Sequence, residues 1–344
     1  MNQSRGPTDR DRPIRVEDVA RVAGVSPITV SRALRTPEKV KQATLDRVLE
    51  AVAETGYQIN SIASSLRSGQ SAFVTVFVAS LQNLHYAAAT QGLIDAFKGS
   101  RYHLIFAQTG YAEDIDVELL RSMLPFRPAA VVFSGIVRNP VAVAFLKSLA
   151  IPVMELWGEV PDPIDMLVMS PAREGGRLIG EHVVAEGYKR IAYAGHTISR
   201  SLPRIEGLRE ALASHGQDLA LLLPMEGTTE MADGIAVFDR ILEKLPDCDL
   251  MVFGTDVMAA GALVRAQQRR MSVPDQIAIA GYGDLFFAAH TMPQLTTVHM
   301  APYRIGETAG KQLQRRLNGE PVGERIIQVP LRLMARGSTT RRKA

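Results

Sequence analysis

The sequence predicts an all-α helix-turn-helix head followed by an α/β core of two lobes, each built on a doubly wound parallel sheet. Within the first 57 residues, short helical patterns are separated by glycines. From Ala72 onward, short apolar runs alternate with amphipathic stretches at helical spacing. Such alternation is typical of parallel strands covered on both faces by helices. The roughly 270 residues beyond the head are enough for two lobes of this kind.

The head starts with two short helices joined by a tight turn. Three apolar residues of the first helix share one face: Val19, Val22 and Ala23. Gly24 ends this helix, Ser26 is a suitable N-cap, and Pro27 fits the first position of the second helix. In the second helix we expect Val30 and Leu34 to point inward. The other side chains should point largely outward: Ile28, Thr29, Ser31, Arg32 and Arg35.

A third helix is predicted over Gln42–Thr55, and Gly56 ends it. Its apolar residues recur at core spacing: Leu45, Val48, Leu49 and Val52. The segment 57–69 continues at helical spacing but carries too little apolar surface to fold alone. Taken by itself, a helix-turn-helix pattern is also compatible with a helical hairpin that has no role in DNA binding.

Residues 14–66 resemble, without a gap, the N-terminal signature of the LacI family of bacterial repressors. The matching residues are Asp18-Val19-Ala20, Ala23-Gly24-Val25-Ser26, Thr29-Val30-Ser31-Arg32, Gly56-Tyr57, Asn60, Ala63 and Leu66. This resemblance is more specific than a helix-turn-helix pattern alone. It implies that the second helix enters the major groove of an operator.

The resemblance also implies a hinge helix and linker over residues 58–70 that fold only on the operator. Leu66 stands where the family wedges a leucine into the minor groove, and Ala63 stands at the neighbouring contact. Ile28 offers only apolar contact, for example with a thymine methyl, and Lys41 is placed to touch phosphate. The implied DNA contacts are Pro27, Ile28, Thr29, Ser31, Arg32, Arg35, Asn60, Ala63 and Leu66.

The charge distribution suits a DNA-binding head, although the effect is modest and would not identify the function alone. The chain carries 39 Lys and Arg against 36 Asp and Glu, a net charge of +3. Residues 1–70 hold 11 basic and 8 acidic groups and so account for the whole excess. Residues 71–334 are net negative, which favours DNA contact through the head only. We expect the basic residues 336–344 to form a solvated C-terminal tail.

The chain reads as a cytoplasmic protein. A single cysteine, Cys248, excludes an internal disulfide and favours a reducing compartment. Residues 1–13 are polar and contain proline, so we expect a disordered tail and no secretory signal. No apolar run reaches the length of a membrane span, so no membrane partner is expected. The helix-turn-helix domain is then expected over residues 14–57.

The core falls into two similar halves. The first half has expected strands at Ala72–Ala79, Tyr102–Ala107, Ala129–Phe133 and Ile151–Leu156, with helices at Tyr86–Lys98, Ile115–Leu124 and between the last two strands. The second half has expected strands at Arg190–Ala194, Leu219–Leu223, Leu250–Phe253 and Ile277–Ala280, with helices at Ala172–Glu186, Leu202–Ser214, Met231–Lys244 and Val257–Arg269. Ligands of doubly wound sheets bind at the carboxyl ends of the strands, so two facing lobes form a cleft.

This region resembles, more loosely, the sugar-binding core shared by LacI-type repressors and periplasmic binding proteins. The matching segments include Gly187-Tyr188-Lys189-Arg190-Ile191-Ala192, Gly281-Tyr282-Gly283-Asp284 and Pro293-Gln294-Leu295-Thr296-Thr297-Val298. The resemblance implies an effector-binding and dimerisation domain over residues 71–335. Its first lobe would comprise residues 72–168 and 299–327, and its second lobe residues 169–298 and the C-terminal end.

Arg204 stands where the family places a guanidinium that grips the effector, and arginine suits carboxylates and paired hydroxyls. A surface arginine at the start of a helix is the alternative, and Arg200 is a second candidate. Thr255 and Asp256 follow a strand, although Asp256 is better explained as an N-cap. Trp157 either stacks on a sugar face or packs in the core. The expected effector contacts are Arg204, Arg200, Thr255, Trp157, Asp284 and Tyr86.

Two departures from the family pattern bear on the ligand. Gly283, followed by Asp284, stands where an acid or amide is common, and Ser170-Pro171 replaces a frequent Asp-Asn pair. We therefore expect a cleft that keeps arginine, lacks acids, and favours an anion over a neutral sugar. Segments such as Arg35-Thr36-Pro37-Glu38-Lys39-Val40 and Ile151-Pro152-Val153-Met154-Glu155-Leu156 resemble the gluconate-operon branch of the family.

The sequence therefore predicts a homodimeric repressor of a palindromic operator, controlled by gluconate, 2-ketogluconate or 6-phosphogluconate. Two heads are needed because one head makes few base contacts. A regulator of a neutral-sugar operon and a solute-binding protein without a DNA role are the alternatives. No enzyme, metal or cofactor is expected. The seven histidines lack metal-ligand spacing, and Gly306-Glu307-Thr308-Ala309-Gly310-Lys311 departs from the phosphate-loop pattern.

Overall fold

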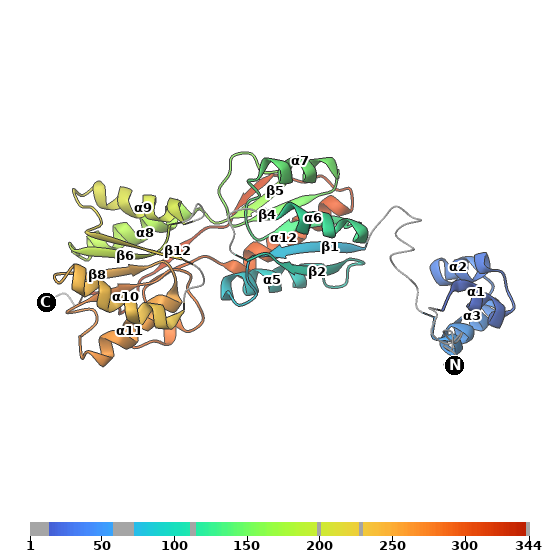
Figure 1. Ribbon diagram of the computed structural model, residues 1–344, viewed down its shortest axis with the longest axis horizontal. Coiled ribbons are helices and arrows are strands. Elements are labelled where there is room, and N and C mark those ends of the chain that lie inside the picture. Colours follow the sequence, from blue (N-terminus) through green and yellow to red (C-terminus); the bar gives the residue numbers. More distant parts are fainter. Residues whose placement is uncertain (1–13, 58–71, 111–114, 198–200, 227–229, 342–344) are drawn as a thin grey trace, which may run out of the picture. The chain divides into compact units, whose positions relative to one another are not determined.

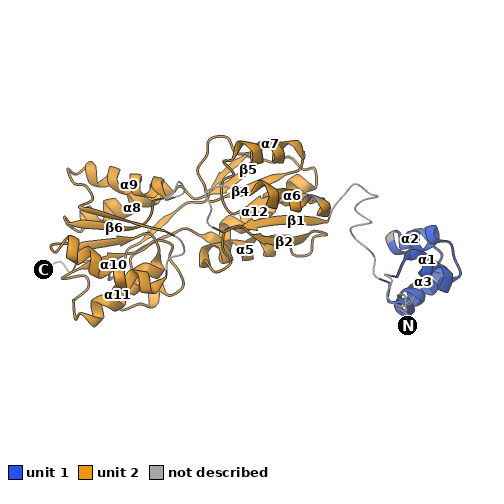
Figure 2. Ribbon diagram, in the orientation of Figure 1, with its two compact units in different colours: residues 1–70 blue, residues 71–344 orange. Residues whose placement is uncertain are grey.

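A computed structural model describes residues 14–57, 72–110, 115–197, 201–226 and 230–341. The chain divides into two compact units, residues 1–70 and 71–344, which Figure 2 shows in different colours. Four of the expected contact residues lie outside the described residues: Asn60, Ala63, Leu66 and Arg200. The expected tail 1–13 and hinge 58–70 lie outside them as well.

The first unit contains three α-helices around a small core. They are α1 (Val16–Ala23), α2 (Pro27–Arg35) and α3 (Gln42–Thr55), with a 3-10 turn at Pro37–Lys39. Gly24 ends α1 with φ 64°, a left-handed conformation that suits glycine. Ser26 caps α2, because its hydroxyl accepts a hydrogen bond from the Thr29 N–H at 3.2 Å.

Two residues expected in this core are instead exposed. The buried arc of α1 runs through Val19, Ala20 and Ala23, and it leaves Val22 43% exposed. On α3 the buried residues are Val48 and Ala51, and Leu49 is 49% exposed. Ala20, Ala23 and Ala51 thus occupy buried positions of the head, whereas the larger Val22 and Leu49 lie at its surface.

The first lobe of the second unit is a six-stranded parallel sheet with the order β11-β5-β4-β3-β1-β2. Strands β1, β2, β4 and β5 of this sheet are labelled in Figure 1. Its strands are β1 (Phe73–Val78), β2 (His103–Gln108), β3 (Ala130–Phe133), β4 (Val153–Leu156), β5 (Met166–Met169) and β11 (Ile326–Gln328). Its helices are α5 (Leu84–Phe97), α6 (Val117–Ser122), α7 (Pro140–Ser148) and α12 (Pro302–Leu317). Alternate strand residues face opposite sides, so Val74 and Val76 pack with α5 and α12, whereas Phe77 packs with α6 and α7.

The second lobe is a four-stranded parallel sheet with the order β7-β6-β8-β9. Its strands are β6 (Ile191–His196), β7 (Leu221–Met225), β8 (Leu250–Phe253) and β9 (Ala278–Ala280). Its helices are α8 (Ala172–Ala185), α9 (Leu202–Ala213), α10 (Met231–Lys244) and α11 (Asp256–Gln268). Helices α8 and α9 pack on one face, and α10 and α11 on the other. Both lobes therefore have the α/β architecture that the sequence predicts.

Three connections join the lobes within the described part of this unit. They follow β5, β10 (Thr297–His299) and β11, and the last leads into β12 (Arg332–Met334), which pairs antiparallel with β10. Ser170 donates a hydrogen bond from Oγ to the Met300 carbonyl at 3.2 Å, which ties two of these connections together. Strands β5, β10, β11 and β12 and helix α12 are additions to the predicted elements, and residues 306–311 lie inside α12.

The expected solvated tail at 336–344 is wrong for the described residues up to 341. Ser338 and Thr339 are fully buried, and Ser338 accepts and donates hydrogen bonds within the second lobe. The Arg336 guanidinium contacts the Asp284 carboxylate at 2.7 Å. Solvation was expected for Arg336 because its half-buried acidic partner, Asp284, lies some 50 residues earlier in the sequence.

Candidate functional site

The N-terminal part of α2 presents an exposed surface. Ile28 is 71% exposed, and Pro27 and Arg32 are also exposed. Thr29 and Ser31 are half-buried, and the Thr29 hydroxyl is 2.9 Å from the Ser26 hydroxyl at the helix cap. Val30 is fully buried. Helix α2 thus has an inner apolar side and an exposed side on which Pro27, Ile28 and Arg32 lie.

The second unit contains a cavity of about 650 Å³. It is lined from the first lobe by residues at the start of α5 and by Trp157 after β4. From the second lobe it is lined by residues that follow β6, β7, β8 and β9. These are the carboxyl ends of parallel strands, where doubly wound sheets bind their ligands. The volume falls in the range of small-molecule sites, about 300–1,000 Å³.

Four of the expected effector contacts meet around this cavity: Tyr86, Trp157, Arg204 and Thr255. Thr255 also caps α11, because its hydroxyl accepts a hydrogen bond from the Met258 N–H at 3.3 Å. Asp284 does not line the cavity. Four of the six predicted side chains therefore line the cavity, Asp284 lies outside it, and their contact with an effector stays a prediction.

Arg204, on the first turn of α9, is held by contacts with the segments that follow β8 and β9. Its Nη1 donates a hydrogen bond to the Gly254 carbonyl at 2.6 Å, at the end of β8. Its guanidinium carbon lies 3.6 Å from the centre of the Tyr282 ring, a cation–π contact. Its Nε is enclosed without a hydrogen-bond partner, and no ion pair joins Arg204 to an acid among the described residues. The positive charge therefore faces the cavity without a carboxylate to neutralise it.

A close approach of two helices fixes the position of Arg204. A Cβ on Gly176 of α8 would lie 1.9 Å from the Arg204 carbonyl oxygen, and one on Gly207 would lie 1.9 Å from the Arg173 carbonyl. Only glycine fits at both positions, so α8 and α9 pack backbone against backbone. Arg204 is therefore placed by a rigid helix pair.

Aromatic side chains form the wall contributed by the first lobe. The rings of Tyr86 and Trp157 pack edge to face, with centroids 6.2 Å apart. Trp157 has φ 72°, a left-handed conformation that is unusual for a bulky residue. Its indole Nε1 is enclosed and has no hydrogen-bond partner among the described residues. The wall thus offers an aromatic, apolar surface to the cavity.

His85 is an additional cavity residue, which the sequence did not single out. Burial, and to a smaller degree the charge of Arg204, lower the pKa of His85 to about 4, so the ring is neutral at pH 7. A Cβ on Gly283 would lie 2.2 Å from the His85 ring, and Gly283 has φ 134°. The ring therefore requires a glycine at 283, where the family pattern commonly has an acid or an amide.

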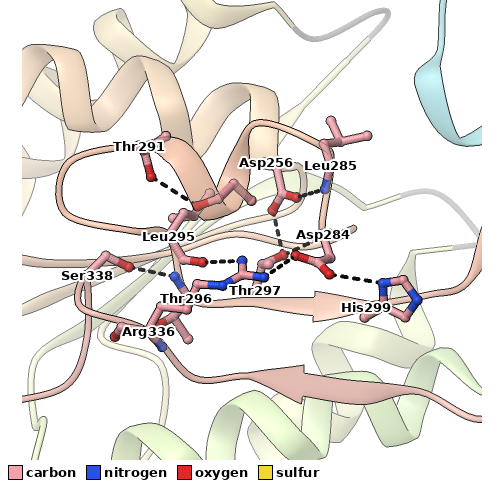
Figure 3. A network of polar contacts seen from close by, with 11 residues as sticks. Asp256, Asp284, Leu285, Thr291, Leu295, Thr296, Thr297, His299, Arg336 and Ser338 are labelled. Carbon is pink, nitrogen blue, oxygen red and sulfur yellow. Dashed lines mark hydrogen bonds and ion pairs between the residues drawn. The ribbon is translucent and has the colours of Figure 1, made fainter.

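Asp256 and Asp284 belong to a network of polar contacts, which Figure 3 shows from close by. Asp256 accepts hydrogen bonds from the Thr297 hydroxyl at 2.6 Å and the Leu285 N–H at 2.7 Å. Asp284 contacts the Arg336 guanidinium at 2.7 Å and accepts a hydrogen bond from His299 Nδ1 at 3.0 Å. Asp256 is therefore not the N-cap of α11, and Asp284 has both carboxylate oxygens engaged within the protein.

Asp256 is fully buried, and this changes its titration. Desolvation raises its pKa from 3.8 to about 6, although the hydrogen bonds from Thr297 and Leu285 oppose the shift. Arg336 also lowers the pKa, and Asp284 raises it. The network thus holds a carboxyl group that is much less acidic than a solvated aspartate.

The expectation of a cavity without acids is wrong. Glu226, directly after β7, and Glu230, at the N-cap of α10, both line the cavity. The absence of an acid at positions 170 and 283 therefore does not leave the cavity free of carboxylates. Glu226 and Glu230 lie on a different strand end, which the sequence comparison with the family pattern did not cover.

Comparison with known proteins agrees with both units. The family described as "Bacterial regulatory proteins, lacI family" matches residues 15–60, and the "Periplasmic binding protein-like domain" matches residues 181–339. The "HTH-type transcriptional regulator GntR" of Pseudomonas aeruginosa is 32% identical over 94% of this chain and 95% of its own length. This chain belongs to the LacI family.

Further relatives and solved structures are similar to this chain over nearly its whole length. The "Catabolite control protein A" of Priestia megaterium is 29% identical over 95% of this chain and 99% of its own length. A LacI-family regulator from Silicibacter pomeroyi shares 29% identity and a TM-score of 0.89 over 96% of this chain and all of its own. The lac repressor dimer bound to operator superposes with a TM-score of 0.82 at 23% identity, covering 96% of this chain and all of its own, which supports the fold.

The LacI-family membership sets the class of the molecule. The family consists of DNA-binding transcriptional regulators rather than enzymes. Among the described residues, no group of three or more His, Cys, Asp or Glu side chains is placed to hold a metal ion. No helix in the described ranges has the length and apolar character needed to span a membrane.

Proposed function

We propose that this LacI-family protein is a repressor that binds a palindromic operator as a homodimer and is released by a sugar acid such as gluconate. The effector occupies the cavity, and its carboxylate binds Arg204. The single observation that carries the proposal is the guanidinium of Arg204 in the cavity without an acidic partner among the described residues. Two curated relatives that carry the name GntR support the choice of ligand class.

On the DNA side, the proposed contacts are made by the exposed surface of α2 and by the hinge. Ile28 and Arg32 are exposed there, and Leu66 is the proposed minor-groove wedge. Dimerisation is part of the proposal because two heads are required to contact two half-sites. A solute-binding role without DNA does not account for a head of the LacI family.

A neutral sugar is the second candidate effector, because one observation favours it. The carboxylates of Glu226 and Glu230 line the cavity and can accept hydrogen bonds from sugar hydroxyls. The Trp157 and Tyr86 rings offer a surface for a sugar face. A neutral sugar, however, leaves the charge of Arg204 without a counter-ion.

Ligand binding and DNA binding together test the proposal. Isothermal titration calorimetry of the full chain should show binding of gluconate or 2-ketogluconate at least tenfold tighter than that of glucose, ribose or adenine. Fluorescence anisotropy with the protein's own promoter DNA should show that the bound acid weakens the complex. Binding of a neutral sugar with no response to any sugar acid would replace the proposed ligand class and leave the regulator role intact.

A further inference from the structure

The charged groups of the cavity are divided between two strand ends. The tip of Arg204 is fixed at the end of β8 by its hydrogen bond to the Gly254 carbonyl. Glu226 follows β7 directly, and Glu230 caps the helix that comes next. Strand β6 lies between β7 and β8 in the sheet. Because neighbouring strands are about 4.8 Å apart, the two ends are separated by roughly 10 Å.

These three side chains are the only arginine, lysine, aspartate or glutamate residues that line the cavity in the described part of the chain. His85, which lies near Arg204, has its pKa lowered to about 4 and adds no charge at pH 7. Among the described residues, the cavity therefore has an arginine at the end of β8 and two glutamates near the end of β7, with His196 at the end of β6 between them. A ligand that spans it meets opposite charges at its two ends.

We infer that the effector is a monoanion whose far end is uncharged and hydroxylated, and that Glu226 and Glu230 reject sugar acids with a second anionic group. This inference rests on the proposed function, since it assumes that a sugar acid binds at Arg204. A terminal hydroxyl donates a hydrogen bond to a glutamate carboxylate. A phosphate or second carboxylate at that end brings like charges together and lacks a proton to donate, which is a repulsive element of specificity.

A dianionic ligand meets the glutamates in either orientation. Glucarate carries a carboxylate at each end, so either orientation brings one carboxylate to the glutamates. In 6-phosphogluconate the same holds for the phosphate or the carboxylate. Glucarate is the sharper probe, because it differs from gluconate only in the oxidation of the terminal carbon and is nearly the same size.

The experiment compares the three acids by isothermal titration calorimetry on the full chain. Glucarate and 6-phosphogluconate should bind at least tenfold more weakly than gluconate, which corresponds to about 1.4 kcal/mol. The ratio should shrink as salt is raised, because ions screen exposed charges. In Glu226→Gln the ratio should fall, and in Glu226→Gln combined with Glu230→Gln it should be below threefold. Glutamine keeps an oxygen that can accept the cap hydrogen bonds at position 230.

Glu243→Gln is the matched control. Glu243 is an exposed residue of α10 that does not line the cavity, so this variant should keep the full ratio. Equal affinities of gluconate and glucarate for the wild type would overturn the inference and leave the proposed function standing. A ratio that persists in the double variant would show that other groups reject the dianion. Absence of binding by every sugar acid would remove the proposed function and this inference with it.

Discussion

Replacing Arg204 by alanine is the most direct test of the cavity. The variant should lose the response to the sugar acid and keep operator binding, because the head and the cavity belong to different compact units. A ligand changes the DNA affinity only as far as it binds two states of the protein differently. Without the guanidinium, the carboxylate of the ligand has no positive partner in the described part of the cavity.

The structure gives the size of both effects. A hydrogen bond to a charged group contributes about 1.5–3 kcal/mol, so Kd should rise roughly 10- to 150-fold. The folded state loses the hydrogen bond to Gly254 and the contact with Tyr282, together about 2 kcal/mol. For a unit of this size, 2 kcal/mol lowers Tm by only about 4–8 °C. The variant should therefore remain folded at 25 °C, and weaker binding cannot be attributed to unfolding.

The assay is titration calorimetry with gluconate, followed by operator binding with and without the ligand. Arg209→Ala is the matched control, since Arg209 lies on the same helix, is half-exposed, and does not line the cavity. Arg204→Lys should fall between the wild type and Arg204→Ala, because lysine keeps the charge and loses the planar fork. A gluconate Kd within threefold of the wild type in folded Arg204→Ala would refute the assignment.

Four further predictions follow from the head, the hinge, the cavity and the buried network. Arg32→Ala should weaken operator binding, as measured by anisotropy at several salt concentrations, with Tm changed by no more than about 2 °C, because Arg32 is exposed; a large loss of Tm would make the residue structural. Leu66→Ala should reduce both operator affinity and DNA bending in a gel-based bending assay, and unchanged affinity would contradict the wedge. Gly283→Ala should lower stability by about 1–3 kcal/mol in urea unfolding, because φ is 134° and the Cβ meets His85. Asp256→Asn should remove a pH dependence. The pKa of Asp256 is higher in the folded state than in the unfolded state, so protonation of its carboxyl group stabilises the folded state. This stabilisation is fully present below pH 3.8, and about 3 kcal/mol of the unfolding free energy is lost as the pH rises from 3.8 through 6. Unfolding free energies of both proteins between pH 3.5 and 7.5 should diverge in that window, and parallel curves would contradict the shift.

The sequence predicted elements whose pattern is local. Helices α3 and α10 and strand β8 have the predicted bounds, because their apolar periodicity and end signals lie within the segment itself. Strands β10 and β12 were not predicted, since each has three residues and is defined by its pairing partner. The three-residue β9 was predicted because it lies in a longer apolar run, which β10 and β12 lack.

Some residues of the candidate site could also be predicted from the sequence, and others could not. Arg204 and Trp157 were predicted as ligand contacts because of their family position and their place at a strand end, and both line the cavity. Asp284 was misassigned because Arg336, its ion-pair partner, is distant in sequence. The need for glycine at 283 depends on His85, in the other lobe, and no local pattern contains that contact. Residue type and strand position therefore indicate a site, and long-range contacts decide which side chains remain available to it.

The three connections between the lobes impose an order on folding. The first lobe needs α12 and β11, and the second lobe is completed by β12 and the buried Ser338 and Thr339. Neither lobe is contiguous in sequence, so during synthesis both must wait for residues beyond 300. The helices of the head, in contrast, are complete by residue 55. A nascent chain therefore presents a folded head well before it holds a finished ligand cavity, and a ribosome-bound chain arrested near residue 290 should resist proteolysis in the head and remain cleavable in both lobes.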